Sequence, residues 1–460
     1  MDAIFDLAQN IVNTRYEDLS REVIDIAKKF IIDTIGVGIA GSAAAGNQAI
    51  MDLVGEWGGK EESTVMVYGL RVPAPEAAFA NSILIHSPDY DDTDDRTATH
   101  ANVTSFPAAL ALAEKTGGGG KSLIAAAVLG VDLTCRLALT ANLFHGWHNT
   151  PIAGVFGAAA AAGKLLGLDR AGMVNALGIA YSQAAGNRQG RADGALTKRL
   201  QPAFMAKAGM VSALLARSGV TGAQNVVQGE WGFFRLYHDY SVEYSPERWA
   251  KALTDGLGIR FEAANLSIKP YPCVRCAHAP IDGALSLAEQ YDLKPGDIDE
   301  VVVNTNQIVL ETAGKPFVIR TNPVVDAQFS IPYVVAVALT RRRVVLDDFE
   351  EKIVRDPTLV ELADRVRVIV PPEFEDSRSV VGPVKVEVRT KTGMELSCTT
   401  GLAKGHPKNP MSDAETTRKF QDCVAHSARL IPERNIEQLL DRLHRLEKVE
   451  YIGEVVRLLV

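Results

Sequence analysis

The segment 151–168 (PIAGVFGAAAAAGKLLGL) is a long apolar run in which alanine and glycine predominate. Such small side chains let neighbouring helices approach closely, so the run predicts a buried helix rather than a membrane span. Segments 75–87, 104–116, 120–142, 170–185 and 200–218 repeat a helical pattern, with Gly or Pro in most of the gaps. A further helical stripe crosses 20–41, where these residues recur every three or four positions: Ile24, Ala27, Ile31, Thr34, Ile35 and Gly38. We therefore expect helix after helix over residues 1–265.

The pattern changes near residue 266. Helical patterns at 277–291 and 326–340 alternate with β-branched segments, and the chain is helical again from about 411. The predicted strands are IDEVVVNT (298–305), RVRVIVPP (365–372) and the hairpin PVKVEVRTKTGMELSCTT (383–400), which turns around Thr392 and Gly393. We predict a mainly α fold: a large, discontinuous all-helical domain (1–265 plus 401–460) with a smaller α/β lid domain (266–400) inserted into it. A cleft between two such domains is a common place for a ligand.

The charge balance argues against several classes of partner. The chain of 460 residues has 48 Lys and Arg against 56 Asp and Glu, a net charge of −8, and no basic run. Bulk binding to nucleic acid or to an anionic membrane is therefore not expected. The N-terminus MDAIFDLAQN lacks the basic and apolar regions of a secretory signal, and five cysteines fit free thiols in a reducing compartment. These features predict a cytoplasmic location.

Three short motifs resemble cofactor sites but stand in the wrong context. GVGIAG (36–41) has the glycine spacing of a dinucleotide-binding loop, but a helical pattern precedes it where a strand is required. KTGGGGKS (115–122) resembles a phosphate-binding loop, yet Lys115 stands where that motif needs its first glycine. The cysteine pair in CVRCAH (273–278) has no second pair at zinc spacing, and no His directly follows the second cysteine as in haem attachment. No cofactor is predicted from these motifs.

The stretch HSPDYDDTDDRTATHA (86–101) holds five Asp residues within seven positions, with His86 and His100 near its ends. An EF-hand calcium loop starting at Asp89 would need Gly at position 94 and Glu at position 100, where this chain has Asp94 and His100. We therefore predict no metal site. A solvated charged loop and an acid–base site both remain open at this point.

Polar and basic residues gather in four short segments of the otherwise apolar helical part: 86–100, 145–151, 187–202 and 268–278. His100 and His148 are candidates for proton transfer because imidazole titrates near neutrality, and Asp89 or Asp92 could orient such a histidine. Single histidines are nevertheless more often structural than catalytic, and spacing alone does not bring the four segments together. The basic residues that could neutralise two or three substrate carboxylates are Arg188, Arg191, Lys198, Arg199, Lys269 and Arg275.

Five ordered segments resemble the MmgE/PrpD family over nearly the whole chain. They are HSPDYDDT (86–93) with a His seven residues beyond it, GWHNTPIAGVFGAAAAAGKLLGLD (146–169), LTKRLQPAFMAKAG (196–209), IKPYPCVRCAHAPID (268–282) and AQFSIPYVVAVAL (327–339). The resemblance implies a large helical domain with an α/β lid, a homodimer, and catalysis without a metal, nucleotide or organic cofactor. It also implies a site that matches the decarboxylase branch residue by residue: Asp89, Thr93, His100, His148, Lys198, Lys269 and Tyr333.

Reactions of this family handle a proton on a carbon next to a carboxylate, so negative charge builds up on that carboxylate. Fixed cations stabilise such charge. The roles that the resemblance implies are charge stabilisation by Lys198 and Lys269 with help from Arg199 and Arg275, proton transfer by His100 and His148, tuning of His100 by Asp89, and auxiliary proton donation by Tyr333.

Two departures from the family pattern bear on the substrate. Many dehydratases have His-Pro-Ser after the first motif, where this chain has His100-Ala101-Asn102, and Arg96 in the polar DRTAT (95–99) could contact an extra substrate carboxylate. We expect a small di- or tricarboxylate as substrate, and dehydration of the 2-methylcitrate type as the default reaction. Epimerisation of an iminodisuccinate-type compound and decarboxylation of the cis-aconitate type are the alternatives within the family. A non-catalytic ligand-binding protein is the alternative from another class.

Overall fold

The computed structural model describes residues 1–140, 146–238 and 243–460, so His145, the first residue of the polar segment 145–151, lies outside the described residues. Helices make up 58% of the chain and strands 8%, which confirms the mainly α prediction. The helices of the N-terminal part are α1 (Ile4–Asn13), α2 (Arg21–Gly41), α3 (Asn47–Trp57), α4 (Ala74–His86), α5 (Asn102–Thr116), α6 (Gly120–Thr140), α7 (Asn149–Leu165), α8 (Arg170–Tyr181), α9 (Gln189–Ala192), α10 (Thr197–Arg217), α11 (Phe233–Tyr237) and α12 (Pro246–Thr254). A short ribbon of β1 (Ser63–Thr64) and β2 (Arg71–Val72) lies between α3 and α4.

Helix α7 packs against α5, α6 and α10, which confirms the buried helix predicted from its small residues. A Cβ atom added at Gly157 would lie only 2.0 Å from Thr134 Oγ1, and one added at Gly154 would lie 2.6 Å from Thr104 Oγ1. Only glycine therefore permits these helices to approach so closely. Its neighbour α6 is long and apolar enough to cross a membrane, and 94% of its apolar window lies buried inside the protein.

Polar caps fix the starts of several helices. Asp169 accepts a hydrogen bond from the backbone N of Gly172 at 2.7 Å and so begins α8. Ser412 and Glu415 form a capping box at the start of α19 (Asp413–Ala425), the first of the helices that return to the N-terminal part.

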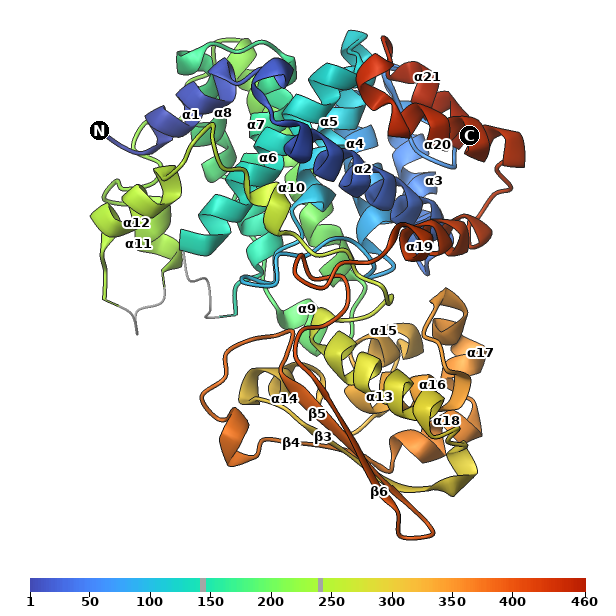
Figure 1. Cartoon of the computed structure of the whole chain (residues 1–460). Helices are drawn as coiled ribbons and strands as arrows, with labels where there is room; N and C mark the ends of the chain where they lie inside the picture. The colour runs from blue at the N-terminus through green and yellow to red at the C-terminus, as the bar shows by residue number, and fades with distance from the viewer. Residues whose placement is uncertain (141–145, 239–242) are drawn as a thin grey trace.

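These returning helices also include α20 (Glu433–His444) and α21 (Gly453–Val456). Figure 1 shows both chain ends in this helical part of the molecule.

A four-stranded sheet lies in the C-terminal part of the chain and has the order β4-β3-β5-β6. Its strands are β3 (Ile298–Asn304), β4 (Val366–Ile369), β5 (Val384–Thr390) and β6 (Glu395–Thr400). Strands β3 and β4 are parallel, whereas the other pairs are antiparallel. The predicted hairpin is confirmed, because β5 and β6 pair across a turn in which Gly393 has a φ of +85°. The helices of this part are α13 (His278–Gln290), α14 (Gln307–Ala313), α15 (Pro323–Gln328), α16 (Ile331–Arg341), α17 (Glu351–Val354) and α18 (Pro357–Ala363).

The buried apolar residues form two main clusters. One spans Ala3 to Phe261 together with Phe420 to Leu459, and the other spans Cys273 to Ala403. Figure 1 shows the corresponding helical and α/β parts one above the other, with α9 between them. We propose from these clusters that the chain divides near residues 266 and 401, and the lid function of the α/β part stays a prediction.

Replacing Gly157 with Ala should destabilise the protein by about 3 kcal/mol, because the new methyl group overlaps Thr134 Oγ1 and the backbone of α6. Chemical denaturation would measure this change. The matched control is Gly296→Ala, since nothing lies within 4 Å of a Cβ at that position; a change below about 0.5 kcal/mol is expected there. Equal stability of the two variants would contradict the close packing of α6 and α7.

Candidate active site

A cavity of about 450 Å³ lies at the junction of the helical part and the α/β part, and its volume fits a small-molecule site. The α/β part contributes Ile308, Thr312, Phe329, Arg378 and Val380 to its lining. Most of the predicted site residues line it together: Asp89, Thr93, Arg96, His100, His148, Lys198, Lys269 and Arg275. The structure therefore brings together segments that are far apart in the sequence.

The Asp-rich stretch is not a solvated loop. Asp91, Asp92 and Asp94 are fully buried, and Asp89 is only 3% exposed. Asp92 Oδ2 accepts hydrogen bonds from the backbone N atoms of Ala101 and Asn102 at 3.1 and 3.4 Å, where α5 begins. Burial and the neighbouring Asp91 raise the pKa of Asp92 to about 7. Of the two interpretations left open by the sequence, the structure favours the acid–base site.

Asp89 holds two lysines at the cavity. Lys198 Nζ donates to Asp89 Oδ1 at 2.7 Å, and Lys269 Nζ donates to Asp89 Oδ2 at 3.0 Å and to the Asp89 carbonyl oxygen at 2.9 Å. Burial acts to raise the pKa of Asp89, but the two ammonium groups outweigh it and hold that pKa well below its usual range. Burial lowers the pKa of Lys198 despite the attraction of Asp89. Two cations and one anion leave this group with a formal charge of +1.

Three elements meet at Asp89. The residue follows α4 with a φ of +53°, Lys198 is in the first turn of α10, and Lys269 precedes the segment that enters the α/β part. Tyr90 Oη donates to the carbonyl of Pro270 at 3.0 Å and so joins the loop to that segment. A left-handed backbone at a residue other than glycine is unfavourable, and it persists where the surroundings fix it, as the two lysines do here.

The two predicted histidines line the cavity from the starts of two helices. His148 is the N-cap residue of α7, and its Nδ1 lies 3.2 Å from Gln201 Oε1. His100 lies two residues before α5, and its Nδ1 lies 2.7 Å from the carbonyl oxygen of Asp92. Burial lowers the pKa of both imidazoles well below the usual value, so both are neutral near pH 7 in the free protein.

The tuning of His100 by Asp89 stays a prediction, because the hydrogen bonds of the Asp89 carboxylate are to the two lysines. Asp89 is engaged by the two lysines, whereas the carboxylate nearest to His100 belongs to Asp91, whose Oδ2 lies 3.3 Å from His100 Nδ1. Adjacent residues of a loop point in different directions, and sequence spacing does not reveal which of them reaches a given ring.

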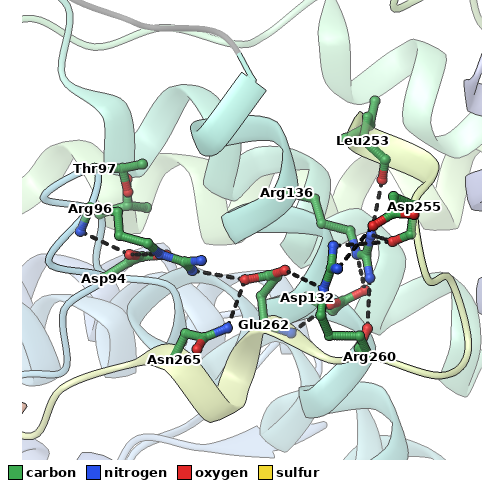
Figure 2. Close-up of polar contacts among 11 residues, drawn as sticks. Asp94, Arg96, Thr97, Asp132, Arg136, Leu253, Asp255, Arg260, Glu262 and Asn265 are labelled. Atoms are coloured by element: carbon green, nitrogen blue, oxygen red, sulfur yellow. Dashed lines mark hydrogen bonds and ion pairs between the residues drawn. The ribbon is translucent and has the colours of Figure 1, made fainter. Parts of the chain in front are cut away.

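Arg96 lines the cavity but is bound to protein carboxylates, as Figure 2 shows. Its guanidinium donates to Asp94 Oδ1 and Oδ2 at 2.8 and 2.6 Å and to Glu262 Oε2 at 2.8 Å. Glu262 is in turn joined to a second buried pair, because Asp132 Oδ1 accepts from its backbone N at 2.8 Å while Asp132 Oδ2 accepts from Arg136. The guanidinium of Arg96 is therefore already bound to two protein carboxylates, and its contact with a substrate carboxylate stays a prediction.

Three other predicted residues have distinct surroundings. Arg275 lines the cavity and pairs with Asp95 through two nitrogens, each at 2.9 Å. Arg199 lies in a small adjoining pocket, where it donates to Gln328 Oε1 at 3.0 Å. Tyr333 is fully buried in the α/β part, and its hydroxyl donates to the carbonyl of Asp348 at 2.5 Å. Tyr333 is therefore not brought to the cavity, and the predicted donor role does not fit its position.

Phe329 is a lining residue that the sequence interpretation passed over. It belongs to the same family segment as Tyr333 but precedes the N-cap Ser330 of α16, and the Lys198 ammonium lies 5.4 Å from the centre of its ring. The family match marked the segment but not the residue within it that faces the site. Further lining residues that were not predicted include Asp95, Thr97, Asn149, Cys276 and Arg378.

The Asp89→Asn variant should lose about 3–5 kcal/mol of unfolding free energy at pH 7, because two buried ammonium groups are left without their counter-ion. Denaturant titration of both proteins would measure the difference. The folded-state pKa of Asp89 is lowered, so this stabilisation is fully present above its unfolded pKa of about 4 and is lost as the pH falls through the folded value.

The control for this variant is Asp441→Asn, which removes an exposed pair with Arg445 at 3.4 Å and should change the stability by less than about 1 kcal/mol. Equal losses in the two variants would contradict a central role for Asp89.

Comparison with known proteins adds to this geometry. The MmgE/PrpD N-terminal domain matches residues 5–245 and the MmgE/PrpD C-terminal domain matches residues 271–445. The chain is 28% identical to a cis-aconitate decarboxylase from Homo sapiens over 96% of this chain and 91% of that protein. It is 24% identical to a cis-aconitate decarboxylase from Aspergillus terreus (96% and 94% covered) and 26% identical to a 2-methylcitrate dehydratase from Cupriavidus necator (85% and 81% covered). The two domains together cover most of the sequence, and the chain belongs to the MmgE/PrpD family.

Proposed function

We propose that this protein is a lyase that forms or protonates a carbanion next to a carboxylate of a small polycarboxylate. The observation that carries the proposal is one cavity that joins the Asp89-held pair of Lys198 and Lys269 to the imidazoles of His100 and His148. The cations supply fixed positive charge, and the imidazoles supply groups that transfer a proton.

Charge stabilisation falls to the two lysines. When an electron pair is left on a carbon next to a carboxylate, the negative charge spreads onto the carboxylate oxygens. Ammonium groups that are already in place stabilise this charge more than they stabilise the substrate, so they lower the barrier. Lys269 is 1% exposed, and water screens its charge little.

Proton transfer falls to the imidazoles. A carbonyl oxygen can only accept a hydrogen bond, so Asp92 O fixes the proton of His100 on Nδ1 and leaves Nε2 for the cavity. In the neutral form Nε2 is a base, and when protonated it is an acid. Substrate carboxylates nearby favour the protonated form, because opposite charges attract.

Decarboxylation of the cis-aconitate type is the reaction that the relatives favour. The decarboxylases align over 96–99% of this chain, whereas the 2-methylcitrate dehydratases align over 81–85%. In this reaction the C–C bond to one carboxylate breaks, CO₂ leaves, and the electron pair remains on carbon until an imidazolium gives it a proton.

Dehydration, our default expectation from the sequence, is the second candidate. The observation that favours it is the carbonyl oxygen of Asp92 against His100 Nδ1, because a ring with its proton on Nδ1 has an unprotonated Nε2 that can remove a proton from carbon. Epimerisation, the homodimer and catalysis without a cofactor stay predictions of the family resemblance, and the cytoplasmic location stays a prediction from the N-terminus and the cysteines. A non-catalytic binding protein would use the same cations without proton transfer.

Two further arginines support a substrate with more than one carboxylate. Arg191 lines the cavity from α9 in the helical part, and Arg378 lines it from the segment before β5 in the α/β part. Among the described residues, no carboxylate forms an ion pair with either of them. Charge-assisted hydrogen bonds to a carboxylate suit an arginine in such a position. We propose that they bind carboxylates that do not react.

Incubation with cis-aconitate in deuterated water should release CO₂ and place one deuterium on the product carbon. Proton NMR and CO₂ detection would follow the reaction. The same assay with 2-methylcitrate and with amino dicarboxylates separates the alternatives, since loss of water yields an alkene, and epimerisation exchanges the proton without loss of water or CO₂.

Variants test whether the named groups carry this activity. His148→Ala and Lys198→Ala should each lower kcat by about 10²–10⁴-fold, while His444→Ala, an exposed histidine on α20, should leave it unchanged. Absence of both turnover and proton exchange with every di- and tricarboxylate tested would contradict the enzymatic proposal.

Arg191→Gln and Arg378→Gln should each raise KM for a tricarboxylate about 10–100-fold, because each removes a charge-assisted contact of about 1.5–3 kcal/mol. Steady-state kinetics would measure this, with Arg434→Gln on the exposed face of α20 as the control. KM for an analogue that lacks the contacted carboxylate should change much less. An equal increase for both substrates would contradict recognition of an additional carboxylate.

A further inference from the structure

We propose that His86 and Asp91 are positioning residues that hold His100 in one tautomer and stabilise its protonated form. Neither residue lines the cavity, and neither was predicted as a site residue. This inference deepens the proposed function, because it explains how His100 becomes a proton donor at the site described above.

The three side chains form a buried chain behind the cavity. Asp91 Oδ2 lies 2.8 Å from His86 Nδ1 and 3.3 Å from His100 Nδ1. His86 and Asp91 are 0% exposed, while the His100 side chain is 11% exposed and reaches the cavity. One carboxylate oxygen thus lies against both imidazoles, whose ring centroids are 5.0 Å apart, and His100 is the member of this cluster that lines the cavity.

The acceptors around His100 fix where its proton resides. The carbonyl oxygen of Asp92 and the carboxylate of Asp91 both lie on the Nδ1 side of the ring, and both are acceptors. Nδ1 therefore carries the proton in the neutral ring, and a second proton is bound at Nε2. The resulting imidazolium faces a carboxylate 3.3 Å away, so Asp91 favours it.

His86 orients Asp91 through the same carboxylate oxygen that lies near His100. A carboxylate only accepts, so His86 donates from Nδ1 to Asp91 Oδ2, and this hydrogen bond limits rotation of the carboxylate. The Nε2 of His86 is buried and has no hydrogen-bond partner among the residues that the structure describes. If His86 is neutral and its proton is on Nδ1, the buried Nε2 carries no proton. The ring then adds no positive charge next to His100.

The surrounding charges allow few protons in this cluster. The ring of His86 lies 5.0 Å from that of His100 and 6.3 Å from that of His148, measured between centroids, so protonation of one ring disfavours protonation of the others. Burial is the first cause that lowers the pKa of His100; the charges of Lys269, His86 and Lys198 act in the same direction, whereas Asp91 raises that pKa. The ring is also coupled to the charge of Asp89. Removing Asp91 should therefore make His100 harder to protonate.

A metal site is the competing interpretation, because ligand atoms of His86, Asp91 and His100 lie within 4.8 Å of one another. A metal ion binds the unprotonated nitrogen of an imidazole. Nδ1 of His100 is 2.7 Å from a carbonyl oxygen and must carry a proton there, so it is not free for a metal ion. The geometry favours a hydrogen-bonded chain.

The test compares Asp91→Asn and His86→Gln with the wild type over a range of pH. Asp91→Asn should lower kcat about 100-fold with KM changed less than about threefold, and should move the pKa of the catalytic acid down by about 1–2. His86→Gln should show a smaller change in the same direction, because the amide can still donate to Asp91. The control is Glu114→Gln, which breaks the 2.9 Å pair of the buried Glu114 with Arg71. Neither residue lines the cavity, so this variant should leave the pH profile unchanged.

Nitrogen-15 NMR of the histidine rings tests the inference without substrate, with His100→Gln to assign the signal. The wild type should show the Nδ1–H tautomer of His100, and Asp91→Asn should lower the pKa of that ring. If no polycarboxylate turns over but the NMR result holds, the proposed function fails and the positioning role stands. An Nε2–H tautomer, an unchanged pKa in Asp91→Asn, or a bound zinc ion that this variant loses would each overturn the inference.

Discussion

The carboxylate of Asp89, held between two buried ammonium groups, is the contact on which the other features of the site depend. Burial of the ammonium groups of Lys198 and Lys269 without a counter-ion would be strongly unfavourable, because an ammonium loses its hydration there. Since the lysines come from α10 and from the segment that enters the α/β part, the same carboxylate joins the two parts of the molecule. Asp89 has a left-handed backbone conformation, and its contacts with both lysines hold it there.

The alanine and glycine residues of the helical part help to hold the site residues in position. Close packing of α6 against α7 and of α5 against α7 fixes the helix starts that carry the site: His148 caps α7, Lys198 is in the first turn of α10, and His100 precedes α5. Side chains on rigid elements hold a catalytic geometry better than side chains on long loops. The alanine and glycine residues therefore contribute to the site, because the close packing that they allow holds its side chains in place.

Much of this could be predicted from the sequence, because periodicity and motif order report on elements and on segments. The helices and the β5–β6 hairpin follow from such signals, whereas the convergence of His100, His148 and the two lysines was implied only by the resemblance to the MmgE/PrpD family. The direction of a side chain cannot be predicted from periodicity or motif order. Phe329 lines the cavity, whereas Tyr333, four residues further on, is buried within the α/β part. Arg378 was missed because it stands in no motif and reaches the cavity only through the fold of the α/β part.

Substrate binding and protonation of the imidazoles are linked in such a site. Burial comes first among the causes that lower the pKa of His148, and the charge of Lys198 comes second. A polycarboxylate next to Lys198 offsets that charge, so the bound state favours the imidazolium that the free protein disfavours. The starts of α5, α7 and α10 add partial positive charge that also favours the anion. Because decarboxylation consumes one proton per turnover, a site that takes up a proton together with its anionic substrate suits that reaction better than one that holds the proton beforehand.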